Sequence, residues 1–354
     1  RMQESSNPLG FNNPPHRILE HASILPSSKW PRHTRWLSSV VLNRTAVLPA
    51  HNYQVPGIEF HPELRRSARL VPKQMITPVT LPFVRAATRM MWRHPPKGVE
   101  VLTLAPGVKV RLHRPPTGSG PGPALLWIHG GGYVIGDAAQ DDVLCRRFAA
   151  ELGATVVAVD YRLAPEHPYP AGLDDCYAAL RWLVALPAVD PARVAIGGAS
   201  AGGGLAAALA LHARDAGEFP LAAQLLVYPM LDDRTVLRKD LDHPGHRLWN
   251  QSSNRFGWRA YLGDADPDRA VPARRDDLAG LPPAWIGVGT FDLFHDEDLA
   301  YAERLRAAGV SCDVMVIEGA FHGFDGIAPK ADVSQSFFRS QCAMLTTAFA
   351  PAAA

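Results

Sequence analysis

The chain has 354 residues, of which 47% are hydrophobic, and its 36 Lys and Arg nearly balance its 34 Asp and Glu. A net charge of +2 without a run of basic residues leaves no concentrated positive surface for phosphate, so we expect no nucleic-acid partner. No window of about 18 apolar residues and no secretory leader pattern occurs, which predicts no membrane span and a cytoplasmic location.

The four cysteines lie far apart and form no pair with the two-residue spacing of a zinc or redox motif. Neither a disulfide framework nor a metal site is indicated, and we expect free thiols in or near the core. Nothing else in the sequence points to a metal or a cofactor. The cysteines are Cys145, Cys176, Cys312 and Cys342.

Residues 1–60 are rich in Pro, Asn, Ser and His and show neither a helical nor an alternating period. They are predicted to form an irregular N-terminal arm. Packing against a second subunit would explain an ordered arm of this kind, so a homodimer is left open. A helical pattern follows over residues 81–92.

From residue 99 onward, short apolar runs alternate with longer helical patterns, interrupted by a polar insertion at 231–275. This alternation predicts an α/β fold with a mostly parallel central sheet and helices on both faces. The predicted strands are 108–113, 124–128, 155–161, 193–196, 223–228, 284–288 and 312–317. The predicted helices are 142–151, 173–186, 201–215, 296–308 and 332–347.

The segment from Gly198 to Gly202 reads G-A-S-A-G and matches the pattern G-x-S-x-G. It follows the predicted strand RVAIG and precedes a helical pattern, the context in which this motif presents a nucleophilic serine on a tight turn. The peptide N–H groups behind Ser200 lie at a helix N-terminus, where partial positive charge favours an anion. Taken alone, the motif would also fit a Gly-rich helix start without chemistry.

Three glycines, Gly130 to Gly132, follow His129 directly after the predicted strand ALLWI. Such a run leaves peptide N–H groups bare and lets a substrate oxygen approach the backbone closely. It lies at the carboxyl end of a strand, which is where ligands of open α/β sheets bind. These features favour an oxyanion-binding loop over a merely flexible one.

A serine nucleophile needs a base and an orienting carboxylate, and in this kind of fold the chain order is Ser, Asp or Glu, then His. Asp292 follows the predicted strand AWIGVG and His322 follows CDVMVIE. Both lie at the same edge of the predicted sheet as Ser200, so we expect the three side chains to converge. Other acidic residues nearby are expected to serve the first turn of the next helix. These are Asp296, Glu297 and Asp298.

With these motifs, the sequence resembles the hormone-sensitive lipase-like group (family IV) of α/β-hydrolases, the bacterial esterases that carry HGGG. Residues 160–171, which read DYRLAPEHPYPA, are similar to that group's hallmark segment. Residues 261–263 and 281–284 also fall where the group has similar residues. The resemblance spans residues 99–347.

The resemblance implies an α/β-hydrolase catalytic domain over residues 99–347. It also implies a helical cap whose N-terminal part is residues 61–98 and whose second part is the insertion at about 231–275. Within this cap, aromatic and Met side chains are candidates to line an acyl or alcohol pocket, although packing would explain each of them equally well. These are Met90, Met91, Trp92, Trp249, Phe256 and Trp258.

The group's pattern also implies roles for the glycine loop and its surroundings. The peptide N–H groups of Gly131, Gly132 and Ala201 are expected to hold the oxyanion, with Gly130 as a less favoured fourth donor. His129 is expected to support the loop through its ring. Two X-Pro bonds are candidates for the cis form, namely Ala164-Pro165 and Tyr169-Pro170.

Two positions depart from the group's pattern. Ala199 stands before the serine where the group has Asp or Thr, which removes one polar contact at the turn. Leu293-Phe294-His295 follow Asp292 where the group has Pro-Leu-Arg. The second change leaves the acid in place and alters the wall of the nearby pocket.

The function that follows is that of a serine carboxylesterase. Its substrates are small-molecule esters of short to medium acyl chain, which it hydrolyses through an acyl-enzyme intermediate. The same three residues would also act on an amide, a lactone or an acetylated natural product. A non-catalytic small-ligand receptor on the same fold is a further alternative, disfavoured by the intact His322. A nucleotide site is disfavoured because the glycine run lacks the G-x-G-x-x-G spacing.

Overall fold

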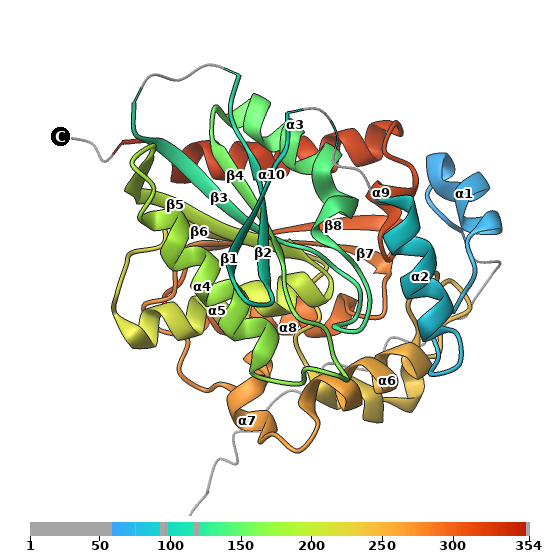
Figure 1. Ribbon diagram of the computed structural model, residues 1–354. Helices are drawn as coiled ribbons and strands as arrows, with labels where there is room; N and C mark the ends of the chain where they lie inside the picture. Colours follow the sequence, from blue (N-terminus) through green and yellow to red (C-terminus); the bar gives the residue numbers. More distant parts are fainter. Residues whose placement is uncertain (1–58, 75, 93–95, 97, 117–119, 352–354) are drawn as a thin grey trace, which may run out of the picture. The chain divides into compact units, whose positions relative to one another are not determined.

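The computed structural model describes residues 59–351, apart from 75, 93–95, 97 and 117–119 (Figure 1). The arm predicted for residues 1–60 therefore lies almost entirely outside the described residues. Within the described part, the chain forms an α/β structure around one eight-stranded sheet.

The sheet has the order β1-β2-β4-β3-β5-β6-β7-β8. β2 is antiparallel to both of its neighbours, and the strands from β4 to β8 run parallel to each other. The predicted mostly parallel sheet is thus confirmed. The strands are β1 (Glu100–Ala105), β2 (Val108–His113), β3 (Gly122–Ile128), β4 (Thr155–Asp160), β5 (Val189–Ala199), β6 (Ala223–Val227), β7 (Ala284–Phe291) and β8 (Cys312–Phe321).

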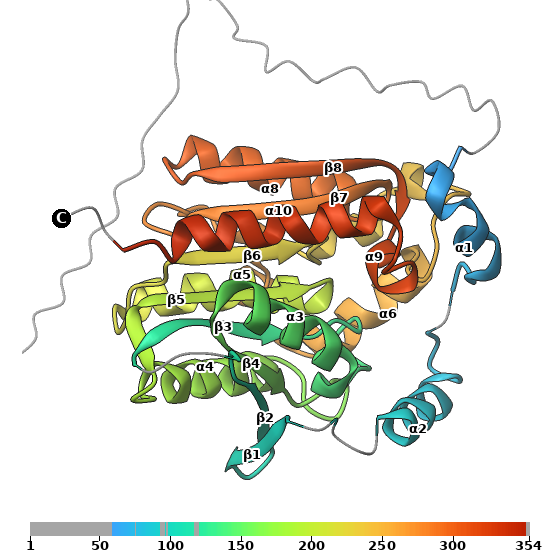
Figure 2. The same cartoon turned by 90° about the horizontal axis from the view of Figure 1, so that it is seen from above.

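Successive side chains of a strand point to opposite faces, so the sheet separates two apolar layers. In β3, Leu126 and Ile128 pack in one layer, and Leu125 and Trp127 in the other. Helices α4, α5 and α8 cover the first face, and α3 and α10 cover the second (Figure 2).

The six predicted helices agree with α2, α3, α4, α5, α8 and α10 to within two residues at each end, whereas α1, α6, α7 and α9 were not predicted. The α-helices are α1 (Arg65–Leu70), α2 (Leu81–Met91), α3 (Asp142–Leu152), α4 (Ala171–Val184), α5 (Ala201–Ala216), α6 (Gln251–Leu262), α7 (Pro267–Ala270), α8 (His295–Ala307), α9 (Phe324–Ile327) and α10 (Asp332–Ala348). Short 3-10 helices are η1 (Pro62–Leu64), η2 (Ala138–Asp141), η3 (Asp233–Leu237), η4 (Lys239–Leu241) and η5 (Pro272–Arg274).

Several strands differ from the sequence prediction. β7 and β8, predicted to end at residues 288 and 317, continue to Phe291 and Phe321. β1 was not predicted, because its residues alternate between exposed and half-buried positions instead of forming a continuous apolar run. β5, predicted over 193–196, begins at Val189 and ends at Ala199. Its first half contains Asp190 and Pro191, which are residue types disfavoured in strands, so the early start is invisible in the sequence.

The segments before β1 and after β6 are hydrogen-bonded to each other. Arg247 donates from Nε to the carbonyl oxygen of Ala68 at 2.6 Å. The N–H of Leu248 donates to the carbonyl of Pro72 at 2.9 Å. Residues 68–72 and 247–248 are therefore in direct contact.

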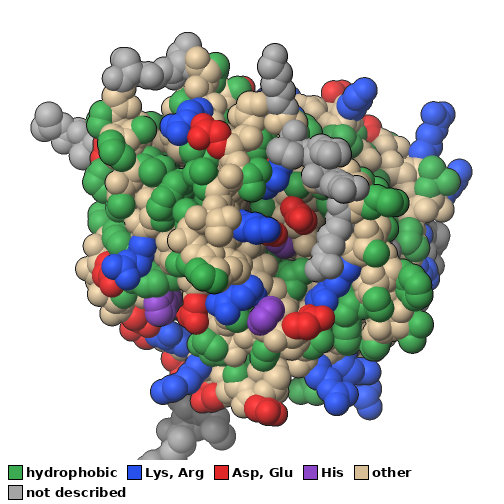
Figure 3. All heavy atoms as spheres, in the orientation of Figure 1, with side chains coloured by type: hydrophobic (Ala, Val, Ile, Leu, Met, Phe, Trp, Pro, Cys, Tyr) green, Lys and Arg blue, Asp and Glu red, His purple; other side chains and the backbone are tan. Residues whose placement is uncertain are grey.

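Four observations on the described residues concern their thiols, surface charge, metal ligands and membrane spans. The four cysteines are buried free thiols. On the face shown in Figure 3, acidic and basic side chains are interspersed. Among the described residues, no group of three His, Cys, Asp or Glu side chains is placed to hold a metal ion. No helix in this part of the chain is long and apolar enough to cross a membrane.

A buried ion pair joins β2 to α3. Arg111 donates to the two carboxylate oxygens of Asp142 at 2.8 and 2.5 Å, and both side chains are buried. An unpaired charge in the interior is strongly disfavoured, so separating β2 from α3 would be costly. The pair therefore holds β2 against the helix that covers it.

We expect Asp142→Ala to lower the free energy of unfolding by about 3–5 kcal/mol, since Arg111 would remain buried without its partner. Urea denaturation followed by circular dichroism measures this loss. Glu100→Ala, which removes the exposed partner of Arg114, is the matched control and should change stability by less than about 1 kcal/mol. Equal effects of the two substitutions would contradict this account.

Candidate active site

Ser200 occupies the turn between β5 and α5. Its backbone has φ 57° and ψ −122°, a conformation that side-chain-bearing residues rarely adopt. The turn is possible because Gly198 and Gly202 lack side chains. A Cβ on Gly198 would lie 2.4 Å from the carbonyl oxygen of Gly202, and a Cβ on Gly202 would lie 2.1 Å from that of Ile128. The tight turn that the motif predicts is therefore present.

Ser200, His322 and Asp292 form one hydrogen-bonded chain. The Nε2 atom of His322 lies 2.9 Å from the Ser200 hydroxyl oxygen. Its Nδ1 atom lies 2.8 Å from Oδ2 of Asp292. An ionised carboxylate accepts only, so Nδ1 carries the proton and Nε2 is left as the acceptor for the serine hydroxyl. The three predicted residues are thus brought together.

The parallel sheet explains this convergence. Asp292 directly follows β7, and His322 directly follows β8. All three side chains are buried, with 4–7% of each residue exposed. The second oxygen of Asp292 accepts the backbone N–H of Phe294 at 3.0 Å, which fixes the carboxylate. The ring of Tyr228 packs edge-on against His322, with centroids 4.9 Å apart.

The glycine loop lies directly against the serine turn. A Cβ on Gly130 would lie 3.0 Å from the carbonyl oxygen of Ala199. Gly131 and Gly132 have φ of 131° and 57°, values that favour glycine. Among the described residues, neither of their N–H groups has a hydrogen-bond acceptor. Ala201 is the first residue of α5, so its N–H has no partner within the helix.

The hallmark segment after β4 supports this loop. Tyr161 stacks on the ring of His129, with centroids 4.3 Å apart, and its hydroxyl donates to the His129 carbonyl at 3.1 Å. Nδ1 of His129 lies 2.8 Å from the carbonyl oxygen of Gly130. The N–H of Ala164 donates to the Tyr133 carbonyl at 2.9 Å. The sequence analysis identified the segment that contains Tyr161 but did not predict a role for this residue.

Both X-Pro bonds expected to be cis are cis, at Ala164-Pro165 and Tyr169-Pro170. The residues between them connect the loop to neighbouring elements. Tyr169 donates its backbone N–H to the Tyr261 carbonyl at 2.7 Å. The segment therefore links the glycine loop to α6.

Residues with strained backbone conformations cluster around Ser200 and the glycine loop. Among the described residues, four that are not glycine have positive φ, and each borders the site. Such clustering is typical of functional sites, where the surrounding structure enforces an unfavourable conformation. The four are Tyr133 after the glycine loop, Ser200, Tyr228 against His322, and Leu248, whose side chain approaches Gly323.

The segment after β6 holds the serine turn and the glycine loop together. The N–H of Met230 donates to the Ser200 carbonyl at 2.9 Å. The Tyr133 hydroxyl donates to the carbonyl of Met230 at 3.1 Å. One residue thus connects the two elements that would bind the reacting carbonyl group.

Glu297 fixes that segment and was not anticipated in this role. It lies in the first turn of α8, as expected, but its carboxyl group is buried. It accepts the N–H groups of Leu231 and Asp232 at 2.7 and 3.0 Å and contacts the hydroxyl of Thr235. Burial raises the pKa of Glu297 to about 8.

The other two acidic residues of that turn differ from each other. Asp296 is exposed and lies 3.0 Å from Nδ1 of His295. Asp298 is fully buried, and burial raises its pKa well above the usual range. Neither is hydrogen-bonded to His322, whose Nδ1 atom lies 2.8 Å from Oδ2 of Asp292.

The candidate pocket residues separate into two groups. Met90 and Met91 are more than two-thirds exposed, and Trp92 is half-buried. Trp249 and Trp258 are buried, with 5% and 2% exposed. Phe256 is half-buried on the same core.

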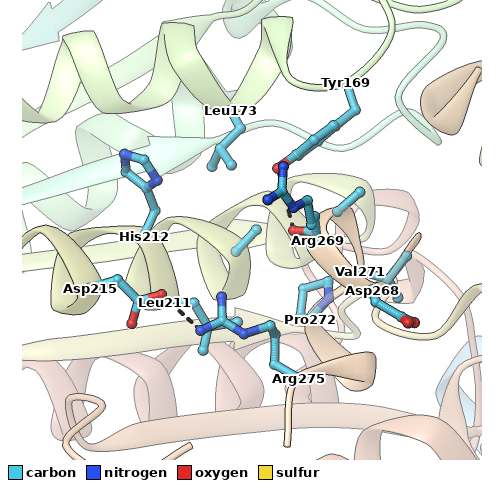
Figure 4. A pocket seen from close by; sticks show the side chains of 12 residues that line it. Tyr169, Leu173, Leu211, His212, Asp215, Asp268, Arg269, Val271, Pro272 and Arg275 are labelled. Atoms are coloured by element: carbon cyan, nitrogen blue, oxygen red, sulfur yellow. Dashed lines mark hydrogen bonds and ion pairs between the residues drawn. The ribbon is translucent and has the colours of Figure 1, made fainter. Parts of the chain in front are cut away.

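A cavity of about 350 Å³ lies at α5 and α7 (Figure 4). Leu173 and Leu211 form part of its apolar lining, and Arg275 pairs with Asp215 across it at 2.8 Å. Its lining includes no residue of the triad or the glycine loop. We therefore do not place the reaction there.

Comparison with known proteins shows the family of the chain. A family model described as an α/β hydrolase fold, Abhydrolase_3, matches residues 125–326. The chain belongs to this α/β-hydrolase family. It is similar to carboxylesterase NlhH of Mycobacterium tuberculosis, at 38% identity over 277 residues, covering 74% of this chain and 82% of that protein.

Two further members of the family are similar to this hydrolase. Esterase LipI of Mycobacterium tuberculosis is 40% identical over 233 residues, covering 62% of this chain and 72% of the relative. The solved structure of a bacterial heroin esterase is 37% identical, with a TM-score of 0.75, and the match covers 82% of this chain and 98% of that one. The resemblance to the hormone-sensitive lipase-like esterases is thereby confirmed.

The raised pKa of Glu297 predicts how stability varies with pH. The ordinary value is 4.5 and the folded value about 8, so the folded state holds a proton that the unfolded state releases. This contribution is complete below about pH 4.5 and is lost as pH rises through about 8. We expect Glu297→Gln, which cannot titrate, to show a weaker fall of the unfolding free energy over this range.

Urea denaturation at several pH values between 5 and 9 measures the effect, which is at most about 1.4 kcal/mol per pH unit for one proton. Glu303→Gln, on the exposed side of the same helix, is the control and should keep the wild-type slope. The interpretation fails if Glu297→Gln and wild type show the same dependence.

Proposed function

We propose that this chain is a serine carboxylesterase that hydrolyses carboxylic esters through an acyl-enzyme intermediate. In this proposal Ser200 is the nucleophile, His322 the general base and acid, and Asp292 the orienting carboxylate. The observation that carries it is the hydrogen-bond chain of 2.9 and 2.8 Å through the two nitrogens of His322. This is the arrangement that activates a serine for attack on a carbonyl.

In the first step, Ser200 attacks the ester carbonyl carbon while Nε2 of His322 takes the hydroxyl proton. Asp292 stabilises the imidazolium and holds the ring in the required tautomer. The protonated Nε2 then gives its proton to the leaving alcohol. The acyl group remains on the serine oxygen.

The negative charge that develops on the carbonyl oxygen needs preorganised donors. The N–H groups of Gly131, Gly132 and Ala201 are the proposed donors. Support comes from the two glycine N–H groups without acceptors and from the helix N-terminus at Ala201. Gly130, whose carbonyl accepts His129 Nδ1–H, is held as part of the loop frame.

Deacylation repeats the cycle with water. His322 removes a proton from a water molecule, which attacks the acyl carbon while the same donors hold the oxyanion. The carboxylic acid leaves and Ser200 regains its proton. No metal or cofactor takes part in this proposed sequence.

The finer features of the function are also proposals. Residues 61–98 and 231–275 would form the cap, supported by the hydrogen bonds between them. The substrate would be a small ester of short to medium acyl chain. The homodimer and the cytoplasmic location stay predictions.

Two alternatives would use the same residues differently. An amide, lactone or acetylated natural product fits the same triad, and a parallel hydrolysis panel separates these from simple esters. A non-catalytic receptor is disfavoured, because His322 keeps both of its hydrogen bonds. The names of the similar proteins, which are esterases, favour esters.

Ser200→Ala is expected to abolish measurable hydrolysis of 4-nitrophenyl acetate, and His322→Ala to lower kcat by about 10³-fold or more. Release of 4-nitrophenolate measures both. Ser311→Ala, an exposed serine outside the site, is the control and should retain wild-type activity. Near wild-type hydrolysis by Ser200→Ala would refute the assignment of the nucleophile.

A further inference from the structure

Helix α2 presents apolar side chains to solvent. A surface helix normally directs its apolar side chains to the core and its polar ones to water. In α2 the exposed positions include Phe83, Met90 and Met91, which are 74%, 77% and 71% exposed. Ala86 and Ala87 are exposed as well. The outer side of α2 is therefore unusually apolar for a helix in contact with water.

Arg85, on the inner side of α2, fixes this orientation. Its guanidinium group donates to the carbonyl oxygens of Val134 and Ala164 at 2.7 and 2.6 Å. It also pairs with the carboxylate of Glu166 at 2.7 Å. Rotating the apolar side of α2 towards the core would break these hydrogen bonds, so the exposure of its apolar side chains follows from the fold.

Exposed apolar side chains are concentrated in this part of the chain. Half of the exposed large hydrophobic side chains of the described residues lie between positions 70 and 91. They are Leu70, Val79, Phe83, Met90 and Met91. Both α1 and α2 lie beyond the end of the sheet at which the parallel strands terminate (Figure 2). Exposed apolar side chains that gather in this way mark a surface that binds a protein or a membrane.

The charge of the same segment indicates the kind of partner. Residues 64–92 contain six Lys and Arg and no Asp or Glu, although the whole chain has 36 against 34. Arg66, Arg69 and Lys73 are exposed, and none of them pairs with an acidic side chain of the described residues. A second copy of the chain would bring like charges together, which disfavours a dimer through this surface. Apolar side chains flanked by Lys and Arg instead match an anionic lipid surface.

We propose that the outer side of α2 and these three basic residues form a docking surface for anionic phospholipid membranes. Phe83, Met90 and Met91 would enter the boundary between headgroups and acyl chains, and the basic side chains would face the lipid phosphates. The protein attaches to the membrane surface in this way without crossing it. The attachment does not depend on the proposed esterase function.

Co-sedimentation with lipid vesicles tests the proposal. The full chain carries Ser200→Ala, so that hydrolysis cannot alter the lipids. Vesicles of phosphatidylcholine alone are compared with vesicles that contain one quarter phosphatidylglycerol, at 0.1 M NaCl. We expect at least about 10-fold tighter binding to the anionic vesicles, and a loss of this preference at 0.5 M NaCl, where charges are screened.

The basic residues are tested together by Arg66→Gln, Arg69→Gln and Lys73→Gln in one chain. Binding to the anionic vesicles should weaken at least about 10-fold, because each Lys or Arg near such a surface contributes about fivefold. The matched control removes the same charge elsewhere and should bind as the unsubstituted chain does. It carries Lys109→Gln, Arg146→Gln and Arg339→Gln, three exposed positions outside this segment.

Phe83→Ser tests the apolar part and should weaken binding to the anionic vesicles at least about 10-fold. Val143→Ser, at a position of α3 that is 65% exposed, is its control and should leave binding unchanged. Circular dichroism verifies that each variant is folded, and Met90→Ser replaces Phe83→Ser if the latter is not.

Three results would overturn the proposal. The first is equal binding to both kinds of vesicle, and the second is an equal loss of binding in the control variants. The third is a dimer of the wild-type chain in size exclusion that Phe83→Ser converts to a monomer, which would assign the surface to a second copy. Failure of the esterase assay would leave all of these measurements unaffected.

Discussion

The site depends on one constraint, the close approach of backbone to backbone around the Ser200 turn. The strained φ of the serine is tolerated because Gly198 and Gly202 let β5 and α5 fold back against each other and against the end of β3 at Ile128. That contact is between main chains, so no side-chain rearrangement relieves it. It places the loop that follows β3 directly beside the serine.

The surrounding elements keep this arrangement in place. Met230 joins the serine turn to Tyr133 of the glycine loop, and Glu297 holds the residues after Met230. Tyr161 packs against the other side of the same loop. The proposed oxyanion donors are therefore held before any substrate arrives, which is the condition under which electrostatic stabilisation of a transition state is strongest.

The sequence predicted the fold class and the positions of Ser200, Asp292 and His322, because parallel strands end at one edge and each residue directly follows such a strand. It did not predict the role of Glu297, and it offered Trp249 only as one of six candidates to line a pocket. A carboxylate in the first turn of a helix is usually expected at the surface. Glu297 is buried because of tertiary packing, which the local sequence does not reveal. The contact of Trp249 with the glycine loop likewise joins segments more than a hundred residues apart.

The central claim is that Ser200 is the nucleophile activated by His322, and covalent trapping tests it most directly. The protein is incubated with a 4-nitrophenyl dialkyl phosphate, and the labelled residue is located by mass spectrometry of its peptides. The account predicts one dialkyl phosphoryl group on Ser200, released 4-nitrophenolate in equal amount, and slow labelling in His322→Ala. Label on another residue, or equal labelling of Ser200→Ala, would contradict it.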